Sequence, residues 1–393
     1  MKMNQRSNYM RKIFVCLVSV YVGIVCTQSF AQNSHVTTVP DQSLLQMSGP
    51  AWWHQTSPSP NPTDLHRRAP KLREQAVIEK ASALLESRSA KAIALVDGDD
   101  IVYSDFKAPA DARSLFFGYS MGKTVTSMAA GKAICERKLS FDTKAVDLVP
   151  ELKGEDLGNA TVRDLLRMAS GAADPNDTSS IWTAQEAKDW STGKITYLDL
   201  LTLRRVAGAK HGIFSDYKPG ELFSYKSTDP LLLSIMVARA TGENWSNWVQ
   251  KQVLDPRGEA KAGIYAQDKS YNGQGDSGLH MTLDDWIRFG RWVKQSSKES
   301  GCFGDYVRAA ISKQIRNPGN TSSRKFGATF DGYGYFVWTD NQIASDTVWF
   351  VGYGGQRIGL DLKSNRMIVV FSNVEDWMAD VYKLGRDWMQ LAR

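Results

Sequence analysis

Cysteine and histidine are scarce in this chain of 393 residues, which holds four cysteines and five histidines. Cys16 and Cys26 lie within the first 31 residues, so only Cys135 and Cys302 remain in the body of the chain. Two cysteines cannot make a disulfide framework. We expect two buried free thiols; a bridge between them is the alternative, because a disulfide could form if the protein enters an oxidising compartment. The histidines are scattered, and no H-E-x-x-H or C-x-x-C cluster occurs, so the sequence predicts no metal site and no cofactor.

A strong excess of one charge is also missing from the body of the chain. The formal net charge is +6, but the first 31 residues carry four basic and no acidic side chains, which leaves +2 for the rest. A nearly neutral body argues against nucleic acid or an anionic membrane as the main partner. Hydrophobic residues make up 42% of the chain and aromatic residues 10%, which predicts a globular protein with a sizeable core.

The N-terminus has the parts of a secretory signal peptide. Basic residues precede an apolar run of 14 residues, Ile13 to Cys26, and small side chains at Ser29 and Ala31 occupy the positions that a signal peptidase reads. The run is short for a bilayer span of roughly 20 residues. We expect cleavage after Ala31, no stable membrane anchor after cleavage, and a periplasmic or secreted protein. An uncleaved membrane anchor is the alternative.

Strand-like segments lie near both ends of the remaining chain, and helical segments fill its middle. Residues 32–69 are rich in Ser, Pro, Thr, Gln and Asn, which predicts an extended arm. Periodicity and turn signals predict helices at Lys71–Arg88, Thr161–Met168, Asp229–Ala240, Asp284–Lys294 and Asp380–Arg393. They predict strands at Ala92–Val96, Ile101–Tyr103, Gly332–Thr339, Val348–Val351, Arg357–Leu362 and Met367–Phe371.

This order predicts an α+β fold with an antiparallel sheet built from both termini, flanked by helices, and a mostly helical inserted lobe. The expected domain covers residues 70–393. Its sheet lobe takes about 70–118 and 331–393, and its helical lobe about 119–330. The cleft between two such lobes is the expected position of a ligand site.

Ser120 and Lys123, in the tetrapeptide S-M-G-K, place a hydroxyl and an amine three residues apart at the expected start of a helix. Positions i and i+3 share one helix face, so the amine could lie beneath the serine oxygen. A desolvated lysine can take the proton of a serine and so activate it as a nucleophile. A helix N-terminus also offers a backbone N–H to a developing oxyanion. A capping serine followed by a solvated lysine is the alternative for the tetrapeptide alone.

Two further segments could complete such a site. Tyr225 follows a Pro-Gly turn and directly precedes an expected helix, so its phenol could act as a proton shuttle; an ordinary packing tyrosine is the alternative. Tyr217 could line the same cleft or lie at the surface. The segment Gly352–Gln356, sequence G-Y-G-G-Q, lies between two expected strands. Its glycines would allow a ligand to approach, and a backbone N–H could be the second oxyanion donor; a plain glycine turn is the alternative.

Together, and in this order, the three segments resemble the serine β-lactamase and penicillin-binding-protein superfamily, which carries an S-x-x-K signature. Thr161–Gly171 is similar to the T-x-x-x-L-L-x-M-x-S-G segment of that superfamily, and Gly275–Trp292 to its G-L-x-x-T-x-x-D-x-x-R-F segment. The likeness covers roughly residues 70–393. It is closest to the class C-like branch, which includes carboxylesterases and 6-aminohexanoate-dimer hydrolases.

The resemblance implies a role for each matching residue. Ser120 would be the acylated nucleophile, Lys123 the amine that helps to remove its proton, and Tyr225 the general base. The backbone N–H groups of Ser120 and Gln356 would be the oxyanion donors. Ser227 stands where class C β-lactamases have asparagine.

The third segment departs from the β-lactamase pattern. Tyr353, Gly354 and Gly355 stand where those enzymes have K-T-G, whose lysine helps to hold the carboxylate of the substrate. A nearby arginine, such as Arg357, could replace that lysine. If no arginine takes that role, the missing lysine favours the esterase and amide-hydrolase branch over the β-lactamases.

We therefore expect an exported serine hydrolase that cleaves a small-molecule ester or linear amide through an acyl-enzyme. A β-lactamase or DD-peptidase acting on β-lactams or peptidoglycan peptides is the alternative enzyme. A non-catalytic ligand-binding or sensor module on the same fold is the alternative of another class.

Overall fold

The structure is a computed structural model of the chain. It describes residues 36–37, 54–172, 185, 188–189, 192–206, 218–261, 263–318 and 329–392. The expected signal peptide and Tyr217 lie outside these residues. Within them, no helix is both long enough and apolar enough to cross a bilayer.

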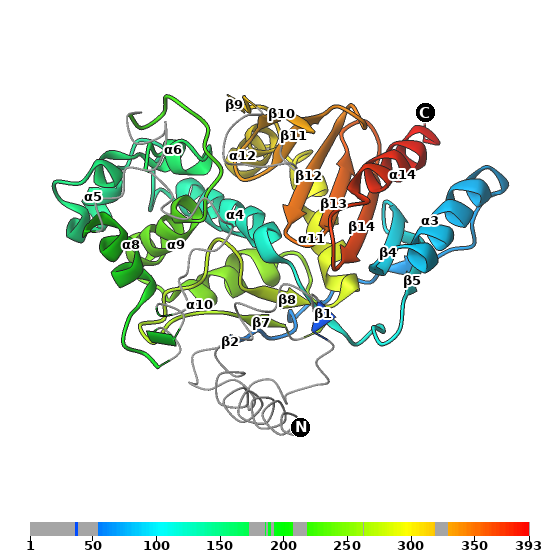
Figure 1. Ribbon diagram of the computed structural model, residues 1–393, viewed down its shortest axis with the longest axis horizontal. Coiled ribbons are helices and arrows are strands. Elements are labelled where there is room, and N and C mark those ends of the chain that lie inside the picture. The colour runs from blue at the N-terminus through cyan, green and yellow to red at the C-terminus, as the bar shows by residue number, and fades with distance from the viewer. Residues whose placement is uncertain are drawn as a thin grey trace, which may run out of the picture.

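Among the described residues, a large sheet of nine strands forms one side of the molecule (Figure 1). Its strands, in spatial order, are β3 (His66–Arg67), β5 (Asp100–Phe106), β4 (Ala90–Asp97), β14 (Arg366–Ser372), β13 (Gln356–Asp361), β12 (Thr347–Gly352), β11 (Trp338–Asn341), β10 (Phe330–Tyr333) and β9 (Ile315–Arg316). Every neighbouring pair is antiparallel except β3 with β5. Because β4 pairs with β14, strands from the N-terminal and C-terminal parts of the domain join in one sheet, as predicted.

Helices cover both faces of this sheet. Side chains along a strand point alternately to the two faces, so this cover buries both sets of side chains. A Cβ atom added to Gly290 of helix α11 (Leu283–Ser296) would contact Ile358, Leu360 and Met367. A Cβ atom added to Gly385 of helix α14 (Met378–Gln390) would instead contact Trp349 and Ile368. Helix α3 (Gln75–Ser87), which follows the short 3-10 turn η2 (Leu72–Glu74), packs beside α14 on the same face (Figure 1).

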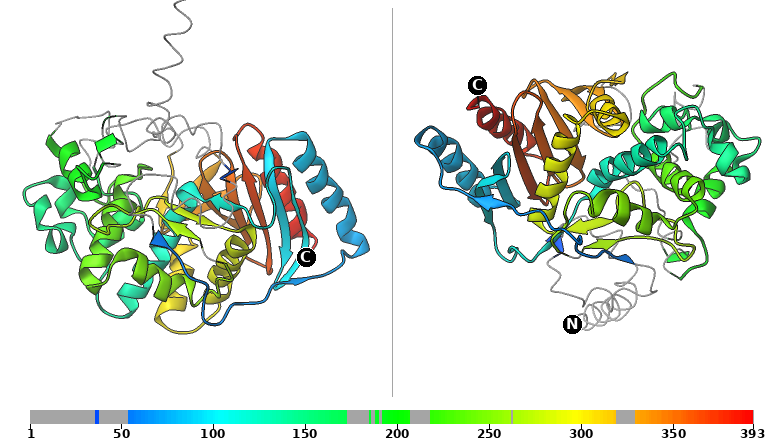
Figure 2. Two further views of the ribbon diagram at one scale, coloured as in Figure 1. Left: turned by 90° about the horizontal axis from the view of Figure 1, so that it is seen from below. Right: turned by 180° about the vertical axis from the view of Figure 1, so that it is seen from behind.

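The second lobe is mostly helical and lies beside the sheet in both views of Figure 2. Its helical elements are η3 (Tyr119–Met121), α4 (Gly122–Cys135), α5 (Ala145–Leu148), η4 (Pro150–Leu152), η5 (Asp156–Asn159), α6 (Val162–Leu166), α8 (Tyr197–Val206), α9 (Thr228–Thr241), α10 (Trp245–Val249), η7 (Gln250–Leu254) and α12 (Cys302–Ala310). Local signals set several of the boundaries. Thr161 caps α6 in a capping box with Asp164, and Gly242 ends α9 with a φ of 71°.

A second, smaller sheet was not expected. In the part of the chain that the structure describes, it has five short strands in the order β1 (Val36–Thr37), β6 (Leu115–Phe117), β8 (Leu279–Met281), β7 (Ile264–Tyr265) and β2 (His54–Gln55). The strands contain two or three residues each, too few for a period of two to be visible in the sequence. Strand β6 of this sheet ends at Phe117, so the sheet holds the segment that leads into Ser120.

Two detailed predictions about the fold were wrong. The aromatic segment Gly332–Thr339 is not one strand, because a turn at residues 334–337 separates β10 from β11, and Phe336 there has a φ of 57°. Cys135 and Cys302 are not free thiols, because they form a disulfide with an S–S distance of 2.02 Å. The bridge joins the end of α4 to the start of α12, and this contact between residues 167 apart depends on tertiary packing.

Candidate active site

Ser120 and Lys123 lie where the chain passes from the sheets into the central helix of the second lobe. Ser120 is in η3 and Lys123 in the first turn of α4, and Lys123 Nζ donates a hydrogen bond to Ser120 Oγ at 2.8 Å. Tyr119, directly before the serine, has a φ of 47°, a left-handed conformation that is strained for an aromatic residue. The predicted juxtaposition of hydroxyl and amine is therefore present in the fold, beside a strained backbone.

The surroundings of the lysine amine fix its position. Lys123 is 1% exposed, and its Nζ also donates to the backbone oxygen of Asp276 at 2.9 Å. The same Nζ lies 5.2 Å from the ring centroid of Tyr225. The amine is thus held between the serine hydroxyl and the tyrosine ring, which brings together the three residues that the sequence proposed as catalytic.

Tyr225 is half-buried against an aromatic wall at the edge of the large sheet. Its ring lies 5.2 Å from that of Trp338 and 6.2 Å from that of Tyr333. The next residue, Lys226, donates through Nζ to the backbone oxygen of Ser224 at 2.8 Å. The lysine therefore braces the turn that presents Tyr225.

A buried polar link supports this turn from the other side. Lys226 Nζ lies 3.6 Å from Asp229 Oδ2, and neither side chain is exposed. Ser170 Oγ donates to Asp229 Oδ1 at 2.5 Å. Burial raises the pKa of Asp229, and the neighbouring Lys226 opposes that shift. These three residues were not proposed from the sequence, although a Lys and an Asp three residues apart at the start of an apolar helix were a possible signal.

The glycine segment forms the turn between β12 and β13 and packs onto the serine segment. A Cβ atom on Gly352 would lie 2.2 Å from the backbone oxygen of Gly118, so no larger residue fits there. Tyr353 then lies edge-on to Tyr119, with ring centroids 5.8 Å apart. Gly355 has a φ of 94°, and a Cβ atom there would lie 2.5 Å from the backbone oxygen of Val374. The turn needs glycine at both ends for close backbone contact and for its conformation.

Gln356 and Arg357 hold this turn from inside the protein. Gln356 is fully buried, and its Nε2 donates to the backbone oxygens of Tyr353 at 2.8 Å and Ser372 at 3.0 Å. Arg357 is also fully buried, and its Nη1 donates to the backbone oxygens of Gly352 at 2.7 Å and Gln356 at 2.9 Å. Its Nε donates to the hydroxyl of a tyrosine on α14 at 3.0 Å. Arg357 is therefore enclosed, and the idea that it replaces the missing lysine as a substrate contact is wrong.

The last three predicted site residues are Ser227, Gly354 and Tyr217. Ser227 is 9% exposed and precedes α9 with helical backbone angles, and its side chain forms no capping bond. Gly354 lies within the β12–β13 turn with a φ of 74°. Tyr217 lies outside the described residues.

An antiparallel sheet built from both termini, joined to a helical lobe through a Ser-x-x-Lys turn, defines a protein of the serine β-lactamase and penicillin-binding-protein superfamily. The Beta-lactamase family model matches residues 77–392, and the chain belongs to that family. The predicted resemblance and the predicted α+β fold are thereby confirmed.

Solved structures with this fold are similar over most of the chain. One is described as "Putative 6-aminohexanoate-dimer hydrolase from Bacillus anthracis", with a TM-score of 0.69 and 18% identity over 90% of this chain and 94% of that one. A second, "Crystal structure of putative beta-lactamase from Bacteroides dorei DSM 17855", has a TM-score of 0.60 and 17% identity over 81% and 97%. A penicillin-binding protein from Bacillus halodurans has a TM-score of 0.55 and 19% identity over 82% and 98%. At these identities the similarity establishes the fold.

Proposed function

We propose that this Beta-lactamase-family serine hydrolase cleaves small carboxylic esters or short linear amides through an acyl-enzyme on Ser120. The observation that carries the proposal is the 2.8 Å hydrogen bond from the buried amine of Lys123 to Ser120 Oγ. Such contact between a nucleophile and a possible base is the geometric requirement for nucleophilic catalysis.

In the acylation step, Ser120 Oγ bonds to the carbonyl carbon of the substrate and its proton passes to the Lys123 amine. The bond from that carbon to the leaving oxygen or nitrogen then breaks, and the leaving group takes a proton from Lys123 or Tyr225. In deacylation, water supplies a proton to the same groups and its oxygen attacks the ester carbon, which releases the acid and restores Ser120. Tyr225 is proposed as a proton carrier because its ring packs beside the amine of Lys123.

The oxyanion would be held by two backbone N–H groups. Ser120 provides the first in our proposal. Gln356, expected as the second, lies across the turn, paired with Gly352 in the strand register. Tyr353 directly follows Gly352, whose backbone abuts Gly118. We therefore keep the N–H of Gln356 as the proposed second donor, because the turn that carries it packs against the serine segment.

The proposed substrate class follows from the charges around the third segment. Tyr353 carries no charge, Arg357 is enclosed by its own hydrogen bonds, and Lys226 is paired with a buried carboxylate. A substrate carboxylate placed here without a partner would pay a desolvation penalty. Neutral-ended esters and neutral-ended short amides are therefore proposed ahead of β-lactams. Aminohexanoate oligomers end in a carboxylate, so the charge argument does not favour them; they stay in the proposal because of the family resemblance and the similar structure described as a 6-aminohexanoate-dimer hydrolase.

We also propose that the protein is exported. The N-terminal basic and apolar segments support this, and so does the Cys135–Cys302 disulfide, because disulfides persist mainly in oxidising compartments.

The test is covalent trapping at Ser120. Wild-type protein and Ser120→Ala would be treated with a fluorophosphonate probe and with a panel of p-nitrophenyl esters, aminohexanoate dimer, D-Ala-D-Ala peptides and a chromogenic cephalosporin. Intact mass should show an adduct on the wild type and none on Ser120→Ala, with fastest turnover on an ester or linear amide. Absence of any wild-type adduct would favour a binding module, and a preference for the cephalosporin or the D-Ala-D-Ala peptide would favour the alternative enzymes.

A further inference from the structure

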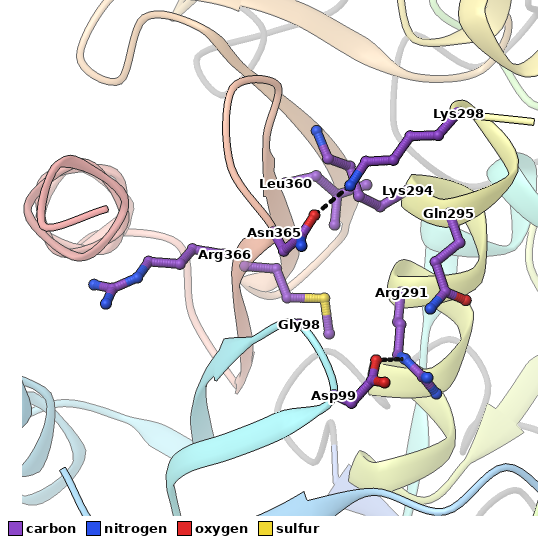
Figure 3. A pocket seen from close by; sticks show the side chains of 10 residues that line it. Gly98, Asp99, Arg291, Lys294, Gln295, Lys298, Leu360, Asn365 and Arg366 are labelled. Carbon is purple, nitrogen blue, oxygen red and sulfur yellow. Dashed lines mark hydrogen bonds and ion pairs between the residues drawn. The ribbon is translucent and has the colours of Figure 1, made fainter. Parts of the chain in front are cut away.

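A second site lies at the opposite end of the strands from the candidate active site. Strand β13 begins at Gln356, beside the serine segment, and ends at Asp361. At that far end, a cavity of about 380 Å³ separates helix α11 from the β4–β5 and β13–β14 turns (Figure 3). Nothing in the proposed reaction uses this cavity.

Three cations from α11 and the turn after it line the cavity on one side. Arg291 and Lys294 are three residues apart on one face of α11, and Lys298 lies in the turn that follows the end of the helix at Ser296. Figure 3 shows Lys298 reaching across to Asn365 on the β13–β14 turn, and Arg291 meeting Asp99 on the β4–β5 turn.

Only one of these cations has a carboxylate partner among the described residues. Arg291 Nε pairs with Asp99 Oδ1 at 2.5 Å. Lys294 Nζ donates to the backbone oxygen of Asp361 at 2.5 Å, and Lys298 Nζ donates to the amide oxygen of Asn365. Both hydrogen-bond acceptors are neutral, so among the described residues neither lysine forms an ion pair with a carboxylate, although the charge of Asp361 attracts Lys294.

The fourth cation of the lining is already balanced. Arg366 points its guanidinium away from the cavity in Figure 3. Its Nη2 lies 2.6 Å from Glu74 Oε1 and 3.4 Å from Asp97 Oδ2. Among the described residues, the lining cations without an ion pair are therefore Lys294 and Lys298.

Burial of the Lys294 amine beside another cation disfavours its charged form. The residue is 9% exposed. Burial, together with repulsion from Lys298, lowers the pKa of Lys294 to about 8, and the attraction of the Asp361 carboxylate only partly opposes this shift. A buried ammonium that forms no ion pair is costly, and the nearby charge of Lys298 adds to that cost. An anion in the cavity would remove both penalties.

We propose that the cavity binds a small anion with two or more negative charges, held by Lys294, Lys298 and Arg291. Charge-assisted hydrogen bonds from these side chains would hold its oxygens. The apolar side chains of Leu360 and Met367 complete the lining. Phosphate-type anions and small polycarboxylates share this chemistry. The proposal does not depend on the activity proposed for Ser120.

The experiment is calorimetric titration of the whole protein with inorganic pyrophosphate and, separately, with citrate, at constant ionic strength. Saturable binding of either anion to the wild type is expected, and the stronger of the two identifies the phosphate or the carboxylate class. Lys298→Gln and Lys294→Met should each raise the dissociation constant at least about tenfold, since each removes a charge-assisted contact. Lys251→Gln, a matched change at an exposed lysine paired with Glu243, should leave it unchanged.

Two results would overturn the proposal. One is the absence of saturable binding of both anions at millimolar concentrations. The other is binding that Lys298→Gln does not weaken more than Lys251→Gln does. Lys298 is exposed, so its variant should fold even if Lys294→Met does not, and a thermal unfolding curve of each variant checks this.

Discussion

Replacing Lys123 by methionine tests whether its amine activates Ser120. Methionine keeps most of the volume of this 1% exposed side chain but removes the donor to Ser120 Oγ and to the backbone oxygen of Asp276. If the amine takes the proton of the serine, kcat should fall about a thousandfold, which corresponds to about 4 kcal/mol in the activation barrier. The free energy of unfolding should change far less, by about 1–2 kcal/mol, because two hydrogen bonds are lost while a buried amine is removed.

A second variant separates proton transfer from simple positive charge. Lys123→Arg keeps a cation, but a guanidinium does not give up its proton, so this variant should also lose about a thousandfold in kcat. Lys132→Met is the matched control, since Lys132 lies on the same helix with its amine 3.8 Å from the Phe303 ring centroid and is no part of the site. The assay is hydrolysis of p-nitrophenyl butyrate, with urea unfolding of each variant. A loss of less than about tenfold in Lys123→Met, or near wild-type rates in Lys123→Arg, would refute a role as base.

Four further outcomes follow from particular contacts. Tyr353→Lys adds the missing cation, so kcat/KM for a cephalosporin should rise relative to that for p-nitrophenyl acetate, and an unchanged ratio would contradict the substrate argument. Arg357→Lys loosens the clamp on the β12–β13 turn; kcat should fall about tenfold to a hundredfold with KM nearly constant, since an oxyanion donor would shift, whereas equal effects on both would indicate a binding role. The hydrogen bond and charge of Arg68 lower the pKa of Glu74 to about 2, so this carboxylate stabilises the fold above about pH 4.5 by about 3 kcal/mol, and the benefit fades as pH falls toward 2. In urea unfolding, Glu74→Gln should therefore differ from the wild type at pH 7 and converge with it near pH 2.5, and a pH-independent difference would speak against this. Cys135→Ser opens a 167-residue loop and should cost up to about 5 kcal/mol in unfolding free energy; equal stability of wild type and variant under non-reducing conditions would show that the bridge does not form.

The sequence alone determined the features that depend on neighbours along the chain. The capping box at Thr161, the glycine end of α9 and the β4–β5 hairpin all follow from residues within a few positions of one another. The approach of Lys123 to Ser120 belongs to the same group, because one turn of helix brings positions i and i+3 together. The family resemblance then supplied the fold as a whole.

Tertiary structure decided the contacts between distant segments. The disulfide joins residues 167 apart, Arg357 turns inward to hold its own hairpin, and the Lys226–Asp229 pair is completed by Ser170 from another helix end. The cavity beside α11 likewise needs two turns that are far from that helix in sequence. No local periodicity encodes such contacts, because the partner of a buried polar group is selected only when the packed sheet and helices bring it within hydrogen-bond distance.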